Sequence, residues 1–374
     1  MVIAQPYLSL MGGAERVVLK IAQHYNAKIY TLEYVRDKTF KEFQDVDIEL
    51  ISKKLPASSI IPYRASRAMA FGYAFYNLKL KNDYDVINAH VSPSEWIRHN
   101  NKRVFWYCHT PVREVYDLYS FRMKNRSYKD KLIYATFAGA YKFIAKDVIK
   151  QIEAIATNSD NVNGRIMKYF NRSATVIHPG VEYEQFENKG DDKYFFYPSR
   201  FYPNKRQDLV MDAFARFVKK SGKENYKLIL AGSISDDKEH IAYLERLKQR
   251  KMKNVEFKLN LPDEKIRELY SNCTAVMFAP INEDFGIVPL EGMSSSKPVI
   301  SINDGGPREV IKDGKTGFLV NNTDEMAEKM QYVVDHGDVA DSIGKAARNA
   351  VEREFSWDAF FRKFDKIVAQ VAKA

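Results

Sequence analysis

Short apolar runs alternate with helical patterns along most of this 374-residue chain. The runs have no helical period, so each predicts a buried strand. They lie at residues 2–4, 27–31, 48–51, 86–89, 104–108, 152–159 and 174–178, and again at 194–197, 227–231, 255–259, 275–279 and 298–302. Strands that alternate with helices are typical of parallel sheets with right-handed crossovers. The pattern therefore predicts an α/β fold.

The length of the chain predicts more than one domain, because a single hydrophobic core usually stops growing below about 300 residues. The share of hydrophobic residues, 45%, is sufficient for two cores. A polar segment at 187–193 interrupts the pattern, and a new strand is predicted at 194–197. We therefore expect one α/β domain over residues 1–187 and a second over residues 188–355.

Cysteine usage and hydropathy indicate the compartment. Cys108 and Cys273 are the only cysteines, so the chain has no disulfide framework and suits a reducing environment. The first residues lack a basic region followed by a long apolar core, so we expect no signal peptide. No run of about 18 apolar residues occurs, which argues against a membrane-spanning helix. We expect a cytoplasmic protein.

Residues 275–291 form the junction that most restricts the function. The apolar run 275–279 is followed by polar turn residues, by Gly286 and by a further apolar segment. This order predicts a strand, a loop and a helix. The start of such a helix offers free N–H groups and the positive end of its dipole, so it can bind a phosphate. Glu283 and Glu291 flank the junction, and carboxylates can accept paired hydrogen bonds from vicinal sugar hydroxyls.

The segment Glu283-Asp-Phe-Gly-Ile-Val-Pro-Leu-Glu291 resembles the signature of family four of the retaining glycosyltransferases. The Gly12-Gly13 pair and the segments 304–307 and 309–320 are also similar to that family, so the resemblance extends from about residue 10 to residue 320. It implies the GT-B fold, in which two Rossmann-like domains with parallel sheets face each other across a cleft. It also implies that residues 356–374 form a helix that returns to the first domain.

The second half carries the residues expected to bind a nucleotide-sugar donor. Arg200 and Lys205 follow its first strand, and an Arg fork with a Lys charge can neutralise a diphosphate without a metal ion. The resemblance implies that they hold the donor diphosphate. N–H groups at the start of the signature helix would join them; these belong to Phe285, Gly286, Ile287 and Val288. Glu283 would orient the donor sugar and Glu291 the ribose, with Gly232 on the nucleoside side.

The first half carries two candidate contacts. Gly13 lies between the first strand and the first helix, where small residues let a backbone approach a phosphate. Its position matches the Gly-rich loop of the family, so we expect a contact with the donor diphosphate. His109 ends the strand at 104–108, and the resemblance implies that it faces the donor hexose. His109 and Glu283 are therefore the expected catalytic residues, and neither is assigned as a covalent nucleophile.

No metal ion or other cofactor is expected, because Arg200, Lys205 and the helix start supply the positive charge. Asp83-Tyr-Asp85 looks like the metal-binding aspartate pair of another glycosyltransferase fold. Here the pair precedes the strand at 86–89, and we interpret it as a solvated strand entry.

The net charge of +10 is concentrated in one region. Residues 51–150 contain 18 Lys or Arg and 7 Asp or Glu, interleaved with aromatic residues. Such segments can lie on an anionic bilayer, but they can equally be a solvated face over a core stripe. Nucleic acid is not expected, because no binding motif accompanies the charge. The candidate membrane contacts are Arg64, Arg67, Arg122, Lys124 and Arg126.

The resemblance implies transfer of a hexose from a nucleotide sugar to a hydroxyl acceptor, with retention of anomeric configuration. The strand end Cys-His-Thr-Pro, with Arg113 and Asp117 after it, looks like mannosyltransferases that build lipid-linked or surface glycans. On that basis GDP-mannose is favoured over UDP-hexose, and the enzyme would be peripheral at the cytoplasmic face of a membrane. Two alternatives remain: a GT-B sugar-nucleotide epimerase, and a non-enzymatic membrane-binding protein with a vestigial donor site.

Overall fold

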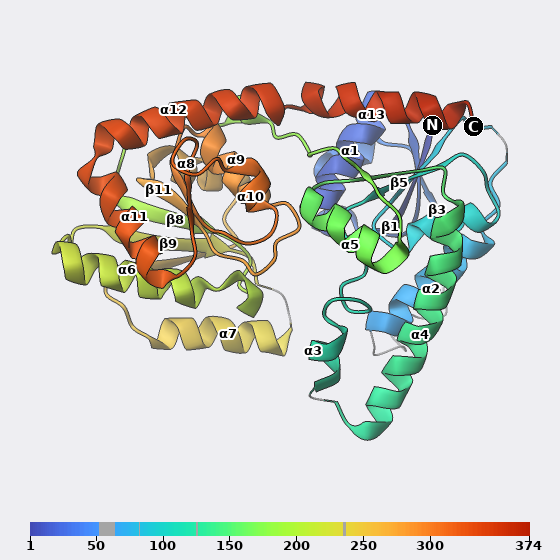
Figure 1. Ribbon diagram of the computed structural model, residues 1–374, viewed down its shortest axis with the longest axis horizontal. Coiled ribbons are helices and arrows are strands. Elements are labelled where there is room, and N and C mark those ends of the chain that lie inside the picture. Colours follow the sequence, from blue (N-terminus) through green and yellow to red (C-terminus); the bar gives the residue numbers. More distant parts are fainter. Residues whose placement is uncertain (52–63, 82, 125, 235–236) are drawn as a thin grey trace. The chain divides into compact units, whose positions relative to one another are not determined.

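The computed structural model describes residues 1–51, 64–81, 83–124, 126–234 and 237–374 (Figure 1). The chain divides into two compact units, one formed by Met1–His178 with Phe361–Ala374 and the other by Pro179–Phe360. The first transition comes before the expected position at 187, whereas the return to the first unit at Phe361 falls within the helix expected over residues 356–374.

The first transition comes early because the segment after His178 packs on the second unit. The Val181 N–H donates to the Phe355 carbonyl at 3.0 Å. A Cβ at Gly180 would lie 2.6 Å from the backbone N of Trp357, so only glycine allows this close approach. Arg348 donates to the carbonyl oxygens of Tyr183 and Phe186. The later boundary, near residue 187, was predicted from the polar composition of residues 187–193 alone.

The first unit contains a seven-stranded parallel sheet, which confirms the α/β class. In sheet order its strands are β3 (Ile48–Leu50), β2 (Lys28–Tyr34), β1 (Val2–Leu8), β4 (Ile87–His90), β5 (Val104–Cys108), β6 (Ala154–Thr157) and β7 (Thr175–Val176). The strand order reverses between β1 and β4, the position at which open α/β sheets bind ligands beyond their carboxyl ends.

Helices cover both faces of this sheet. They are α1 (Gly13–Tyr25), α2 (Arg64–Asn77), α3 (Tyr119–Lys124), α4 (Tyr128–Gln151), α5 (Asp160–Phe170) and α13 (Trp357–Ala372), the last of which begins in the second unit. Every residue of β5 is fully buried. Trp106 belongs to the core shared with α2, α4 and α5, whereas Phe105 packs 5.0 Å from the ring of Phe364 on α13. This two-sided burial explains why the strand reads as a continuous apolar run.

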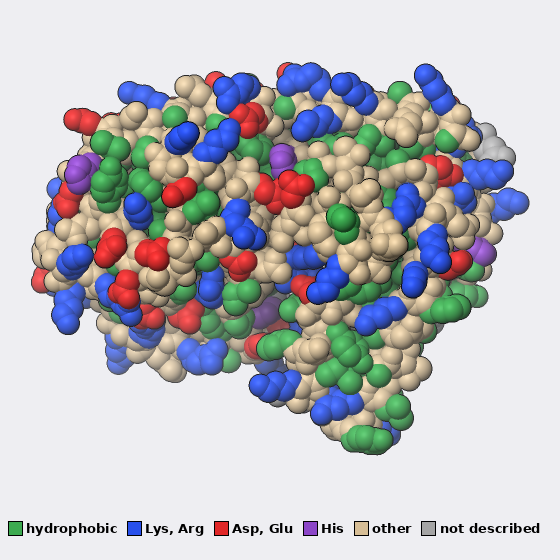
Figure 2. Space-filling view, in the orientation of Figure 1, with side chains coloured by type: hydrophobic (Ala, Val, Ile, Leu, Met, Phe, Trp, Pro, Cys, Tyr) green, Lys and Arg blue, Asp and Glu red, His purple; other side chains and the backbone are tan. Residues whose placement is uncertain are grey.

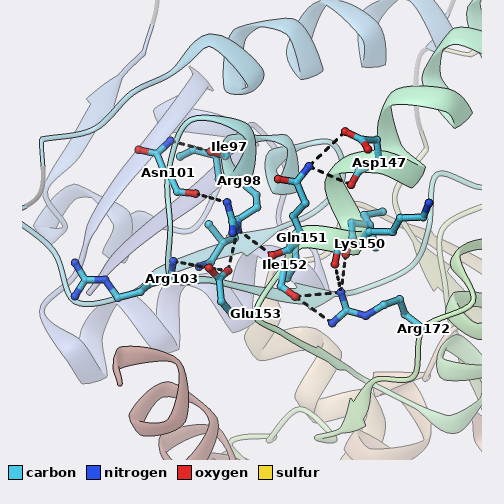
Figure 3. A network of polar contacts seen from close by, with 12 residues as sticks. Ile97, Arg98, Asn101, Arg103, Asp147, Lys150, Gln151, Ile152, Glu153 and Arg172 are labelled. Carbon is cyan, nitrogen blue, oxygen red and sulfur yellow. Dashed lines mark hydrogen bonds and ion pairs between the residues drawn. The ribbon is translucent and has the colours of Figure 1, made fainter. Parts of the chain in front are cut away.

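A polar network ties the amino ends of β5 and β6 to the end of α4 (Figure 3). Glu153 accepts hydrogen bonds from Arg98 Nε at 3.0 Å and from the backbone N–H of Val104 at 2.9 Å. Arg172 donates to the carbonyl oxygens of Ile149 and Ile152, at 2.7 and 3.0 Å. These bonds satisfy carbonyl groups that the end of a helix leaves unpaired. The network lies at the edge opposite the carboxyl ends of the strands, so we interpret it as structural.

The second unit contains a six-stranded parallel sheet. In sheet order its strands are β10 (Val255–Leu259), β9 (Lys227–Gly232), β8 (Tyr194–Pro198), β11 (Ala275–Phe278), β12 (Val299–Ile302) and β13 (Phe318–Val320). The order reverses between β8 and β11, so the loops that follow these two strands lie at the switch point of the sheet. These loops contain Arg200, Lys205 and Glu283.

Helices also cover both faces of the second sheet. They are α6 (Gln207–Ser221), α7 (Lys238–Gln249), α8 (Asp263–Asn272), α9 (Ile287–Ser294), α10 (Pro307–Val310), α11 (Thr323–Asp335) and α12 (Gly337–Glu354). Phe195 of β8 joins the core under α6, α7 and α11, and its neighbour Phe196 joins the core under α8, α9 and α12. Successive strand residues point to opposite faces, so β8 is apolar throughout.

Candidate functional site

The signature segment forms the predicted strand, loop and helix. β11 ends at Phe278, and α9 begins at Ile287. Gly286 immediately precedes the helix with φ of 93°, a conformation that favours glycine, and a Cβ there would lie 3.2 Å from the Phe278 ring. The first N–H groups of a helix have no partner within it, so the start of α9 can accept an anion.

A second turn holds this loop in place. The Gly306 N–H donates to the Glu283 carbonyl at 2.9 Å, and the Asn282 N–H donates to Asp304 Oδ2 at 2.8 Å. A Cβ at Gly305 would lie 2.5 Å from the Glu283 carbonyl oxygen, and Gly305 has φ of 68°. The glycines of the 304–307 turn therefore set the position of Glu283.

Lys205 and Glu283 form an ion pair in the described structure. Lys205 Nζ lies 2.7 Å from Glu283 Oε2, and the two side chains are only 14% and 25% exposed. Lys205 comes from the short helical turn Pro203–Lys205 after β8, and its carbonyl accepts a hydrogen bond from the hydroxyl of Tyr197. The sequence had predicted separate roles for the two residues, and the structure brings their side chains together.

Two arginines lie in the same segment of the chain as Lys205, between β8 and α6. The Arg200 guanidinium lies 4.8 Å from the centre of the Tyr202 ring, which in turn stacks on His240 at 3.9 Å. Arg206 Nε donates to the Ala279 carbonyl at 2.7 Å, at the end of β11. The Nη2 atom of Arg206 is buried and has no hydrogen-bond partner among the described residues. Arg206 was not predicted from the sequence, although it directly follows Lys205.

Glu291 has its own partner. The hydroxyl of Tyr270 on α8 donates to Glu291 Oε2 at 2.6 Å. Burial raises the pKa of Tyr270 well above its usual value, and the neighbouring Glu291 carboxylate raises it further, so the phenol stays protonated and donates. The bond holds one carboxylate oxygen of Glu291 in place, and the contact of Glu291 with a ribose diol stays a prediction.

Gly232 ends β9, where a Cβ would lie only 2.0 Å from the Ser199 carbonyl oxygen. Close packing of two loops therefore accounts for this glycine without a ligand. In the first unit, Gly13 is the first residue of α1 and follows the N-cap residue Gly12. A Cβ at Gly12 would lie 2.6 Å from Glu15 Oε2. The contacts predicted for Gly13 and Gly232 with a donor stay predictions.

His109 directly follows β5 and is partly exposed. Its Nε2 atom lies 3.0 Å from Nδ1 of His90, which is fully buried at the end of β4. Its carbonyl accepts a hydrogen bond from Asn158 Nδ2 at 3.0 Å. Burial lowers the pKa of His109 to about 3, so the ring is neutral at physiological pH.

Glu95 is a second unusual group of the first unit that sequence reasoning missed. It lies in the 3-10 helix Ser94–His99 after β4 and is 1% exposed. Its Oε2 atom has no hydrogen-bond partner in the described part of the chain. Burial raises the pKa of the Glu95 carboxyl to about 8, so it is largely protonated at neutral pH. A single acidic residue in a polar-looking stretch gave no signal of this burial.

Several candidate membrane contacts are engaged within the first unit. Arg67 pairs with Glu33 and lies 5.0 Å from the centre of the Phe71 ring. Arg122 Nη2 lies 3.7 Å from Glu114 Oε1.

Arg126 lies 4.4 Å from the centre of the Tyr134 ring. Lys124 is exposed, and Arg64 begins α2 with a side chain outside the described residues. The sequence alone did not indicate that the arginines have partners within the first unit and that Lys124 is exposed.

Exposed apolar side chains, which the sequence analysis did not single out, gather where α3 and α4 meet (Figure 2). Phe121 is 59% exposed, Tyr128 is 86% exposed and Leu132 is 62% exposed. We call Phe121, Tyr128 and Leu132 the apolar tip. The tip is flanked by the exposed Lys124 and Lys129.

Neither a candidate metal-binding cluster nor a candidate membrane-spanning helix occurs among the described residues. Within them, no three His, Cys, Asp or Glu side chains come together as a group that could hold a metal ion. Among the described helices, none combines the length and the hydropathy that crossing a bilayer requires.

Two parallel-sheet units, with a strand–loop–helix junction at the switch point of the second, have the architecture of the GT-B fold. Two family models match the chain in succession. Glycosyltransferase Family 4 matches residues 11–185, and Glycosyl transferases group 1 matches residues 181–350. Together the two models span residues 11–350, so the chain is a glycosyltransferase of the family 4 type.

Relatives of similar length support this assignment. Alpha-1,3/1,6-mannosyltransferase ALG2 of Dictyostelium discoideum is 25% identical over 412 residues, with 96% of each chain covered. ALG2 of Mus musculus is 27% identical, with 94% of this chain and 91% of the relative covered. Among solved structures, Anabaena Alr3699/HepE in complex with UDP-glucose has a TM-score of 0.76 at 17% identity, with 99% of both chains covered. The structural similarity shows the GT-B fold.

Proposed function

We propose that this glycosyltransferase transfers mannose, with retention of configuration, from GDP-mannose to a hydroxyl of a lipid-linked or surface glycan. Similarity to ALG2 over nearly the whole chain supports mannose as the sugar. The observation that carries the proposal is the Lys205–Glu283 pair beside the start of α9. A UDP-hexose is the second choice of donor, since the HepE complex holds UDP-glucose.

The geometry supports a mechanism that is mostly electrostatic. When the bond between the sugar C1 atom and the donor diphosphate breaks, negative charge develops on the diphosphate. Lys205, Arg200 and the N–H groups at the start of α9 would stabilise this charge, and Arg206 adds a further cation. The acceptor oxygen forms the new bond to C1, and its proton passes to the departing diphosphate. No divalent ion is required for this charge balance.

Glu283 and Lys205 would exchange partners when donor binds. Without a ligand, the lysine charge is neutralised by the carboxylate at 2.7 Å. A diphosphate competes for Lys205, and Glu283 then has acceptor capacity for hydroxyls of the donor sugar. Glu291, held by Tyr270, would accept hydrogen bonds from the ribose diol.

A donor screen tests the proposal. Purified protein is incubated with GDP-mannose, GDP-glucose, UDP-glucose and UDP-N-acetylglucosamine, with and without a mannosylated polyprenyl diphosphate acceptor. We expect GDP release from GDP-mannose that rises when acceptor is added, and a product whose anomeric proton matches the α-configuration of the donor.

The screen also separates the alternatives. Release of nucleotide without acceptor dependence, together with a new donor epimer, would identify an epimerase. Absence of turnover with every donor would leave only the binding-protein alternative and would refute the proposed activity.

We also propose that the enzyme is peripheral, with the apolar tip inserted into an anionic bilayer. Exposed aromatic and aliphatic side chains beside lysines suit the headgroup boundary. The acceptor would then be reached at the membrane surface. Phe121→Ser, Tyr128→Ser and Leu132→Ser in combination should abolish cosedimentation with vesicles containing phosphatidylserine.

The matched control is Ile241→Ser with Val339→Ser, which removes exposed apolar side chains of the second unit. Lys124→Glu with Lys129→Glu should weaken vesicle binding at low salt, without breaking the Arg122 and Arg126 contacts. Equal vesicle binding by wild type and the apolar-tip variant would exclude this mode of attachment.

A further inference from the structure

Three residues of the first unit form a chain of buried hydrogen bonds that ends at His109. Asn88 and His90 are alternate residues of β4, so their side chains point to the same face. Both are fully buried. His90 Nε2 faces Asn88 Oδ1 at 2.5 Å, and His90 Nδ1 faces His109 Nε2 at 3.0 Å. We call this set the Asn88–His90–His109 relay.

The direction of each hydrogen bond follows from the Asn88 amide. Asn88 Nδ2 lies 3.1 Å from the Phe105 carbonyl, which only accepts, so Nδ2 is the donor and Oδ1 is turned to His90. An amide oxygen only accepts, so His90 Nε2 must carry the proton. A neutral imidazole has one N–H, and His90 Nδ1 is therefore a lone pair that accepts from His109 Nε2.

Both rings are held in the neutral form. Burial lowers the pKa of His90 well below its usual value, and the neighbouring His109 lowers it further. Burial also lowers the pKa of His109. The aromatic ring of Tyr107 lies edge-on to His109 at 5.1 Å, and burial keeps that phenol protonated. These contacts provide no carboxylate that would favour an imidazolium.

We propose that Asn88 and His90 are positioning residues that fix the tautomer of His109, so that its Nδ1 atom presents a lone pair to a hydroxyl of the donor sugar. In the described part of the chain, Nδ1 of His109 has no hydrogen-bond partner. The ring is partly exposed, so a ligand can reach it. The hydroxyl proton is shared with Nδ1 and no proton is transferred. The inference about the ligand rests on the proposed function, whereas the tautomer follows from the first unit alone.

The relay gives a role to the two histidines at the neighbouring ends of β4 and β5. With a leucine at position 90, His109 could carry its proton on either nitrogen. In the tautomer with the proton on Nδ1, His109 would donate a hydrogen bond to the sugar. A sugar hydroxyl would then have to accept this bond instead of donating one. A glutamine at position 90 can still offer its amide oxygen to His109 Nε2, and so it serves as the conservative variant.

Nitrogen-15 spectra of histidine-labelled protein test the tautomer directly. The chain has seven histidines, and the His109 signals are assigned from their loss in His109→Gln. We expect a pyridine-like shift for Nδ1 and a pyrrole-like shift for Nε2 at neutral pH, in wild type and in His90→Gln. Protonated Nδ1 in the wild type would overturn the inference, whether or not the enzyme uses mannose. The measurement requires no substrate.

Kinetics test the consequence for the sugar. His90→Leu should lower kcat for sugar transfer by about tenfold to a hundredfold, with a smaller change in the KM for the donor, because one transition-state hydrogen bond is weakened. His90→Gln should recover most of the rate. The double variant His90→Leu/His109→Ala should be no slower than His109→Ala, since the relay acts only through His109.

His99→Leu is the matched control, because His99 stacks on Tyr76 in the same unit and lies outside the relay. Thermal unfolding of each variant shows whether it is folded. A His90→Leu enzyme that is folded and has wild-type kcat would overturn the positioning role. Failure of every donor in the screen, with the expected tautomer observed, would instead refute the proposed function.

Discussion

The carboxyl edges of the two sheets carry opposite kinds of polar group. In the first unit, His90 and Glu95 are buried and His109 is partly exposed, and the shifted pKa of each group favours its neutral form. In the second unit, Lys205 and Glu283 form an ion pair with part of each side chain exposed. Neutral groups suit the recognition of hydroxyls, whereas fixed charges suit a diphosphate. The same α/β architecture therefore presents neutral polar groups in one unit and an ion pair in the other.

The surroundings explain this difference. The β5 strand before His109 is wholly buried and aromatic, so an ion there would lose its hydration without gaining a partner. The loop around Glu283 is tied by the Gly305-Gly306 turn and lies beside the start of α9. A helix start and an opposite charge both stabilise ions. Burial thus favours the neutral form of Glu95, whereas Glu283 forms an ion pair with Lys205.

The largest effect on turnover is expected from substitution of Lys205 or Glu283. Lys205→Ala should lower kcat by about a thousandfold, because a preorganised cation near developing charge supplies several kcal/mol. Glu283→Ala should have a similar effect through the donor sugar. Steady-state kinetics with saturating donor measure both.

The control is Lys223→Ala, which removes a surface pair with Asp335 in the same unit. We expect this variant to keep normal turnover. Near-normal rates in both site variants would remove Lys205 and Glu283 from the site.

The buried carboxyl group of Glu95 should make the stability of the protein depend on pH. The folded-state pKa of Glu95 is about 8, above the unfolded value near 4.5. The folded state therefore keeps a proton that the unfolded state loses as pH rises from about 4.5 to 8, and wild type becomes less stable across this window. Glu95→Gln lacks this titration, so it should be more stable than wild type at pH 8 by on the order of 3 kcal/mol.

Chemical denaturation of both proteins at pH 5 and pH 8 measures the difference. Glu224→Gln, an exposed carboxylate, provides the control. A stability difference that does not change between the two pH values would mean that Glu95 is ionised in the folded protein.

A smaller effect on donor binding is expected from substitution of Tyr270 or Glu291, the residues proposed to hold the ribose. Tyr270→Phe removes the hydrogen bond that holds Glu291, and the KM for the donor should rise about tenfold with little change in kcat. Glu291→Gln should behave similarly if its role is to accept from the ribose. Donor titrations at saturating acceptor measure these values. A fall in kcat with unchanged KM would assign Glu291 to the chemical step instead.

No effect is expected from removal of divalent ions. Arg200, Lys205 and the helix start balance the diphosphate charge in the proposed mechanism, so EDTA should leave the rate within about twofold of the untreated enzyme. Initial rates before and after chelation, with added magnesium or manganese as the comparison, measure this. A strict requirement for either ion would contradict the proposed charge balance.

Much of the architecture was predictable from local patterns. The apolar runs at 104–108 and 255–259 coincide with β5 and β10, because buried parallel strands leave a continuous apolar signal. The apolar run 275–279, the polar turn residues after it and Gly286 correctly indicated a strand, a loop and a helix. The boundary near 188 was less accurate, because packing of Val181 on Phe355 cannot be inferred from composition.

The sequence by itself determined the two sheets, the position of the signature junction and the identity of its charged residues. Tertiary structure decided which of these side chains meet. Lys205 and Glu283 are far apart in the sequence, and His90 and His109 lie on different strands or strand ends. Each pair is nevertheless in hydrogen-bond contact. Local periodicity reports which face of an element is apolar, but a hydrogen bond depends on distance and direction between elements. The protonation of Glu95 and His109 follows from burial, which only the packed units establish.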